Sequence, residues 1–153
     1  MEASELLDRI ASKARPLARN GHVADYIPAL KRVDPEKFGI AVATLDGVVH
    51  ESGDSREAFS IQSISKVFSL VLAYRLMGDD LWGRVGRLPS SSRFNSLVEL
   101  ELERGKPRNP FLNPGALVVA DLLTSRHTQM EGAVVQLLRG LSGSTGIDYD
   151  ISV

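Results

Sequence analysis

A serine and a lysine three residues apart are the pair in this chain best suited to chemistry. Ser63 and Lys66 stand in the stretch 59–68, which reads FSIQSISKVF. Residues three apart share one face of a helix, so the Lys66 amine can reach the Ser63 hydroxyl if the pair opens a helix. A serine hydroxyl beside a base is a nucleophile for acyl transfer. The spacing therefore predicts a serine nucleophile with a lysine general base.

The residues that follow predict the helix that this pair needs. The run 67–77 is almost continuously apolar, and Gly78 can end the helix. Ser63 would then lie near the helix N-terminus, where the helix dipole and free backbone N–H groups can stabilise an oxyanion. The alternative interpretation is an ordinary helix start, with Ser60 or Ser63 as the N-cap and Lys66 on the surface.

Three ordered segments extend this pattern into a family resemblance. The segments 23–30 (VADYIPAL), 60–68 (SIQSISKVF) and 108–121 (RNPFLNPGALVVAD) together resemble the glutaminase family, the serine-dependent amidohydrolases with a β-lactamase-like fold. The similarity runs from about Gly21 to about Tyr149. It implies hydrolysis of L-glutamine to L-glutamate and ammonia, without a cofactor.

The resemblance also implies roles for individual residues. Ser63 matches the nucleophile and Lys66 the general base. Tyr26 matches a tyrosine that contacts substrate or relays a proton, and its alternative is a half-buried loop tyrosine. Asn113 matches the asparagine that holds the polar end of glutamine, although an asparagine before proline can equally cap the helix that follows. The weaker candidates are Gln62 and Asn109, in supporting roles.

The chain departs from the family pattern at two single positions and in its length. Pro114 stands where the family usually has alanine, and it is harmless only if no backbone N–H is needed there. Ser91 replaces a glycine, which is costly only at positive φ. The chain covers about the first half of the family domain, so a substrate-binding glutamate and asparagine and the Lys-Ser-Gly strand would lie past Val153.

Composition excludes several classes of function. The chain has 153 residues, is 43% hydrophobic and carries a net charge of −1, so we expect one globular domain over residues 1–153 that binds neither nucleic acid nor an anionic membrane. No stretch has the ~20 apolar residues of a membrane span. The absence of cysteine is compatible with the cytoplasm. The histidines lack metal-ligand spacing, so we expect no metal and surface positions for His22, His50 and His127.

The expected elements make an α+β fold, and the resemblance implies that this fold is of the β-lactamase and penicillin-binding type. Hairpin strands at 39–45 and 48–51 would be joined by a two-residue turn, Asp46-Gly47. A first helix capped by Ser4 should end near Asn20-Gly21. A polar loop at 89–92 and helices at about 114–125 and 132–141 follow the Ser63 helix. A hairpin with an open edge is marginal alone, so we expect a homo-oligomer.

Two other functions stay open on the sequence. A half-protein that keeps the nucleophile without a closed pocket would not be catalytic. A β-lactamase or penicillin-binding acyltransferase shares Ser-x-x-Lys, but this chain has no Ser-Asp-Asn motif.

Overall fold

The computed structural model describes residues 2–91, 93–96, 101, 103–126 and 132–151. The chain forms two compact units, Met1–Ser60 with Asp150–Val153, and Ile61–Tyr149, called unit 1 and unit 2. Ser92 and His127 lie outside the described residues. Within the described ranges no helix is long and apolar enough to cross a membrane. The assignment of residues 1–153 to a single domain stays a prediction.

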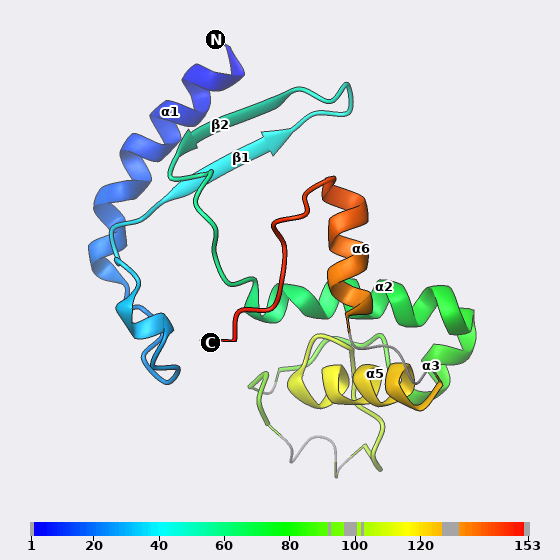
Figure 1. The fold of residues 1–153 in the computed structure, drawn as a ribbon. Helices are drawn as coiled ribbons and strands as arrows, with labels where there is room; N and C mark the ends of the chain where they lie inside the picture. The colour runs from blue at the N-terminus through cyan, green and yellow to red at the C-terminus, as the bar shows by residue number, and fades with distance from the viewer. Residues whose placement is uncertain (1, 92, 97–100, 102, 127–131, 152–153) are drawn as a thin grey trace. The chain divides into compact units, whose positions relative to one another are not determined.

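Unit 1 is a hairpin with a helix along it (Figure 1). The strands β1 (Gly39–Ala43) and β2 (Val49–Gly53) pair antiparallel, which confirms the predicted hairpin. The helix α1 (Ala3–Ala14) packs on the strands and buries Leu7 and Ala11. A short 3-10 helix, η2 (Leu30–Arg32), belongs to the same unit.

The hairpin turn differs from the predicted two-residue turn. The Thr44 N–H donates to the Val48 carbonyl at 2.9 Å and the Gly47 N–H donates to the Thr44 carbonyl at 3.0 Å, so the loop contains three residues. Gly47 has φ +86°, a conformation that glycine adopts without steric cost at the end of such a loop. The Thr44 hydroxyl donates to the Asp46 carboxylate, and this bond is the main cause of a lowered pKa for Asp46.

The start of α1 also corrects a prediction. Ser4 is not the N-cap, because Glu2 occupies that position and makes no side-chain cap bond. Ser4 lies inside the helix, and its Oγ is 3.2 Å from Nδ1 of the half-buried His50. Ser4 thus joins α1 to β2 instead of capping α1.

The end of α1 comes earlier than the predicted Asn20. The α-helix stops at Ala14 and continues as the 3-10 helix η1 (Arg15–Asn20), which has Pro16 in its first turn. Proline has no N–H for an α-helical bond, and its ring clashes with the preceding turn. The change of helix type follows from that one residue.

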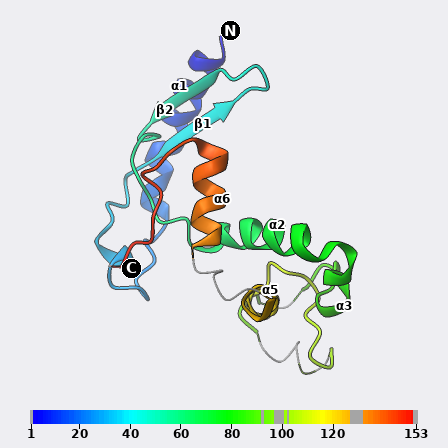
Figure 2. The same cartoon turned by 45° about the vertical axis from the view of Figure 1, so that its right-hand side comes forward.

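Unit 2 is helical, and its two longest helices, α2 and α5, contact each other (Figures 1 and 2). The end of α2 at Gly78, with φ +56°, confirms the predicted stop, and the two later helices fall within two residues of their predicted bounds. Pro89–Ser91 has no helix or strand, as predicted for a loop. Among the described residues of this unit, the elements are η3 (Gln62–Ile64), α2 (Ser65–Met77), η4 (Gly78–Asp80), α3 (Leu81–Arg84), α5 (Asn113–Arg126) and α6 (Ala133–Ser142).

The core of unit 2 holds α2 against α3 and α5. Helices that are apolar on several sides require such burial, because packing rather than propensity supplies most helix stability. This core fixes α2 and α5, the helices that carry Lys66 and Asn113, against each other. The cluster of buried residues is Ala73, Leu81, Val85, Val119, Leu122 and Leu123.

Candidate active site

Ser63 lies in a 3-10 turn directly before α2. The turn is η3, and Lys66 is the second residue of α2. Neither η3 nor α2 has a side-chain cap at its N-terminus, so the interpretation of Ser60 or Ser63 as the N-cap is wrong. Gln62 has φ +43°, a left-handed conformation that is uncommon outside glycine. Backbone strain of this kind concentrates at functional sites, and here it immediately precedes the candidate nucleophile.

The Lys66 amine is held by two oxygen atoms, one in the first residue of α5 and one two residues before that helix. Nζ donates to Oδ1 of Asn113 at 2.6 Å and to the backbone carbonyl of Phe111 at 3.1 Å. Lys66 is half-buried, and both partners are uncharged. Lys66 is therefore not the free surface lysine of the alternative interpretation.

Asn113 reaches Lys66 because of the way α5 begins. The first helical bond of α5 runs from the Ala116 N–H to the Leu112 carbonyl at 2.9 Å, which makes Asn113 the first helical residue. Its own N–H donates to the Phe94 carbonyl at 2.8 Å. The Asn113 side chain does not cap α5, so it is available to accept from Lys66.

Asn109 holds the turn that leads into α5. Its Oδ1 accepts from the N–H groups of Phe111 at 3.0 Å and Leu112 at 3.2 Å, and its Nδ2 donates to the Leu88 carbonyl at 3.0 Å. An asparagine that bonds to the backbone two residues on is a common turn former. Gly115 lets α5 lie against this turn, since a Cβ there would be only 2.0 Å from the Asn109 carbonyl oxygen.

The two local departures from the family pattern are compatible with this backbone. Pro114 is the second residue of α5, and the N–H groups of a first helical turn have no partner within the helix. Ser91 does not have positive φ, because Gln62 and Arg104 are the non-glycine residues with positive φ in the described part of the chain. Neither substitution strains the site.

Ser63 and Lys66 line one hollow of about 400 Å³ on unit 2. Ser63 is exposed, and among the described residues its hydroxyl makes no hydrogen bond. A substrate carbonyl can therefore approach Oγ from the hollow. The lining consists of Gln62, Ser63, Ser65, Lys66, Ser69, Ala116, Val119 and Ala120.

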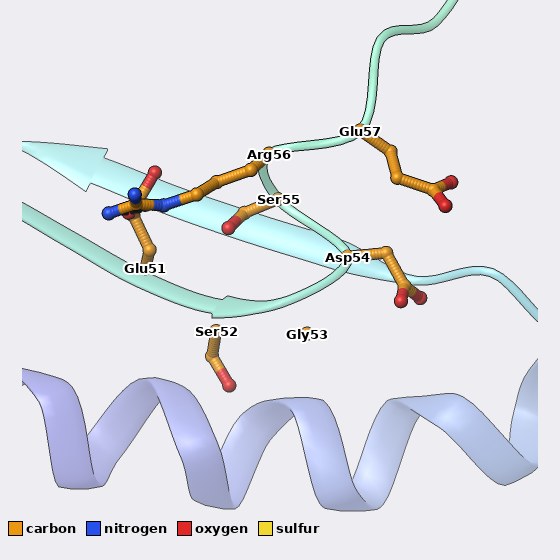
Figure 3. A pocket seen from close by; sticks show the side chains of 7 residues that line it. All are labelled: Glu51, Ser52, Gly53, Asp54, Ser55, Arg56 and Glu57. Carbon is orange, nitrogen blue, oxygen red and sulfur yellow. Dashed lines mark hydrogen bonds and ion pairs between the residues drawn. The ribbon is translucent and has the colours of Figure 1, made fainter.

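A larger hollow, of about 530 Å³, lies on unit 1 and is lined by Glu51–Glu57, the end of β2 and the bend that follows it (Figure 3). Glu51 and Arg56 pair across it at 2.6 Å, and Ser52 donates to Asp8 of α1 at 2.6 Å. Glu57 pairs with Lys37, and this hydrogen bond raises the pKa of Lys37. The charged groups of this hollow are thus paired, and its lining contains no lysine beside a serine.

Tyr26 belongs to unit 1, whereas Ser63, Lys66 and Asn113 belong to unit 2. It stands in the loop before η2 with 79% of its surface exposed, so it is not the half-buried tyrosine of the alternative interpretation.

The contact between Lys66 and the Phe111 carbonyl could not be predicted from the sequence, because every residue has a backbone carbonyl. The turn held by Asn109 did have a sequence signal, because an asparagine commonly bonds to the backbone N–H two residues further on, here that of Phe111. No group of three or more histidine or acidic side chains in the described ranges could hold a metal ion.

Comparison with known proteins identifies the family. The family model described as Glutaminase matches residues 21–153. The chain is 52% identical over 150 residues to a glutaminase of Paraburkholderia phytofirmans, covering 98% of this chain and 49% of that protein. It is 52% identical over 149 residues to Glutaminase 2 of Escherichia coli K12, covering 97% and 48%. The chain thus spans about half the length of these curated relatives.

Solved structures agree with the sequence relatives. The probable glutaminase from Bacillus subtilis complexed with 6-diazo-5-oxo-L-norleucine superposes with a TM-score of 0.75 at 32% identity, covering 94% of this chain and 43% of that one. The protein Mglu in its tris and glutamate form gives a TM-score of 0.81 at 34% identity, covering 94% and 33%. The predicted α+β, β-lactamase-like fold class is confirmed by these neighbours. The chain belongs to the glutaminase family.

Proposed function

We propose that this chain carries the nucleophile and the general base of a glutaminase that forms an acyl-enzyme. Lys66 takes the proton of the Ser63 hydroxyl, and Oγ attacks the side-chain amide carbon of L-glutamine. Lys66 then returns the proton to the leaving nitrogen, and ammonia departs. Water, deprotonated by the same amine, hydrolyses the ester to L-glutamate and restores Ser63. The observation that carries the proposal is the shared hollow of Ser63 and Lys66, with Nζ held by Asn113.

Asn113 and Tyr26 are the two further residues that we propose contact substrate, and each is argued within its own unit. Because Oδ1 of Asn113 accepts from Lys66, its Nδ2 is the group left to meet substrate, and an N–H₂ group donates to an oxygen. We therefore assign Asn113 to an oxygen at the polar end of glutamine. The Tyr26 hydroxyl would donate to substrate or relay a proton, and its exposure supports that role.

The direct test is glutamate release from L-glutamine by the purified chain, beside Ser63→Ala and Lys66→Ala. We expect release by the parent chain and loss of at least ~10³-fold in either variant, as for other nucleophile and base removals. Ser125→Ala, on the far turn of α5, is the matched serine control and should keep the parent rate. Equal rates in Ser63→Ala and the parent would refute the assignment. No release from the parent would favour the non-catalytic half-protein.

Homo-oligomerisation and a cytoplasmic location are part of the same proposal. The hairpin β1–β2 is two-stranded, and a two-stranded sheet seldom stands alone, which supports association with further copies. Gel filtration with light scattering tests this, and a monomer at micromolar concentration would contradict it.

A further inference from the structure

We propose that the Phe111 carbonyl and the Asn113 side chain form a two-acceptor cradle that positions Lys66 for proton transfer. The inference rests on the proposed function, because it gives Asn113 a task beyond substrate binding. Asn113 is in this respect a positioning residue, since it acts on the reaction through Lys66.

Two acceptors leave one position on the Lys66 amine for the reaction. Nζ has three positions besides its bond to carbon, and all three carry N–H groups in the ammonium form. The cradle occupies two of these positions, at 2.6 and 3.1 Å. The third position holds either the last N–H or the lone pair. Proton exchange with the Ser63 hydroxyl is thereby confined to one direction from Nζ.

The cradle is rigid because the backbone around it is fixed twice. Asn109 bonds to the N–H groups of Phe111 and Leu112, which sets the direction of the Phe111 carbonyl. Asn113 is fixed by its own backbone bond to Phe94. A lysine held in one rotamer is ready for transfer, whereas a free lysine must be ordered in each turnover.

Nuclear magnetic resonance of lysine labelled with ¹³C at Cε tests the cradle without substrate. The chain has only five lysines, so their signals can be assigned by substitution: Lys13, Lys31, Lys37, Lys66 and Lys106. An immobilised lysine shows two separate Hε signals, and a freely rotating one shows a single averaged signal. We expect separate signals for Lys66 in the parent chain. Lys106, whose Nζ donates to the Trp82 carbonyl at 2.7 Å, reports whether unit 2 is folded.

Two substitutions separate the acceptor from the rest of the side chain. Asn113→Leu keeps the branched shape of the side chain and removes the acceptor, so the Lys66 signals should merge while those of Lys106 stay unchanged. Asn113→Asp keeps an acceptor and should keep the Lys66 signals apart. Asn113→Ala is the second acceptor-free variant if Asn113→Leu does not fold. Separate Lys66 signals in a folded acceptor-free variant, or merged signals in Asn113→Asp, would overturn the proposal.

Kinetics supply the second readout. Asn113→Leu should lower kcat by about 10²-fold, the loss expected when a reacting group is misplaced by about 1 Å. Asn113→Asp, which loses the Nδ2 donor and keeps the acceptor, should raise KM more than it lowers kcat. An inactive parent chain would refute the proposed function, while the lysine signals would still decide on the cradle.

Discussion

Replacing Gly115 with alanine should destabilise unit 2, although alanine is the better helix former. Gly115 is buried in the first turn of α5. A Cβ at this position would lie 2.0 Å from the Asn109 carbonyl oxygen and 2.9 Å from Pro110 Cα. Ordinary Cβ contacts begin at 3.4 Å, so the Asn109 backbone would have to move by about 1.4 Å. That backbone carries the turn that orients the cradle of Lys66.

Two opposing effects set the size of the change. Alanine in place of glycine in a helix gains up to about 1 kcal/mol. Overpacking costs about 1–3 kcal/mol and occasionally more. The nearest atom at Gly115 is backbone rather than a flexible side chain, so the cost lies at the upper end. We expect a net loss of about 2 kcal/mol in the free energy of unfolding, which lowers the urea midpoint by roughly 1 M.

Fluorescence of Trp82 measures this change in unit 2 alone. Trp82 is the single tryptophan of the chain and packs against the core of unit 2. Gly140→Ala is the matched control, because Gly140 lies in α6 and a Cβ there meets nothing within 4 Å. The control should have an unchanged or higher midpoint. A Gly115→Ala midpoint equal to or above that of the parent chain would refute the close-approach argument.

Two further changes test the core and the hairpin loop. Leu81→Ala removes a side chain with 0% exposure and should cost about 2–5 kcal/mol in urea unfolding followed by Trp82, whereas a loss below about 1 kcal/mol would show that the core is not packed there. The hydrogen bond from Thr44 lowers the pKa of Asp46, so the carboxylate stabilises the folded chain above its ordinary pKa, and this stabilisation is lost as the pH falls through the lowered value. Thr44→Val should raise the Asp46 pKa in a ¹³C carboxyl titration, and an unchanged midpoint would contradict the assigned cause.

The longer elements were predictable because strong local signals agree with tertiary packing. The apolar run after Lys66 and the glycine at Gly78 define α2, and the structure ends the helix at that glycine. The two strand-like segments on either side of Asp46-Gly47 define the hairpin, although Gly47 takes the last place of a three-residue loop. Pro16 indicates an early end of α1, but the helical spacing of apolar residues continues past it, and the prediction followed that spacing.

The site was predictable as a set of residue types and not as a geometry. The spacing of Ser63 and Lys66 indicates a nucleophile and a base, and in the structure both residues line the same hollow. The contact between Lys66 and Asn113 joins residues 47 positions apart, and such a distance depends on how α2 and α5 pack. The positive φ of Gln62 has no sequence signal, since glutamine rarely adopts it.

The central claim is that Ser63 is a nucleophile activated by Lys66 at a site that recognises glutamine. Incubation with 6-diazo-5-oxo-L-norleucine, the diazoketone analogue of glutamine, tests it most directly. Ser63 Oγ would bond to the diazo carbon, dinitrogen would leave, and the serine proton would end on that carbon. Intact mass and peptide mapping should find one adduct, on Ser63, that is absent in Ser63→Ala, slower in Lys66→Ala and suppressed by L-glutamine. An unlabelled Ser63, or labelling that L-glutamine does not suppress, would contradict the claim.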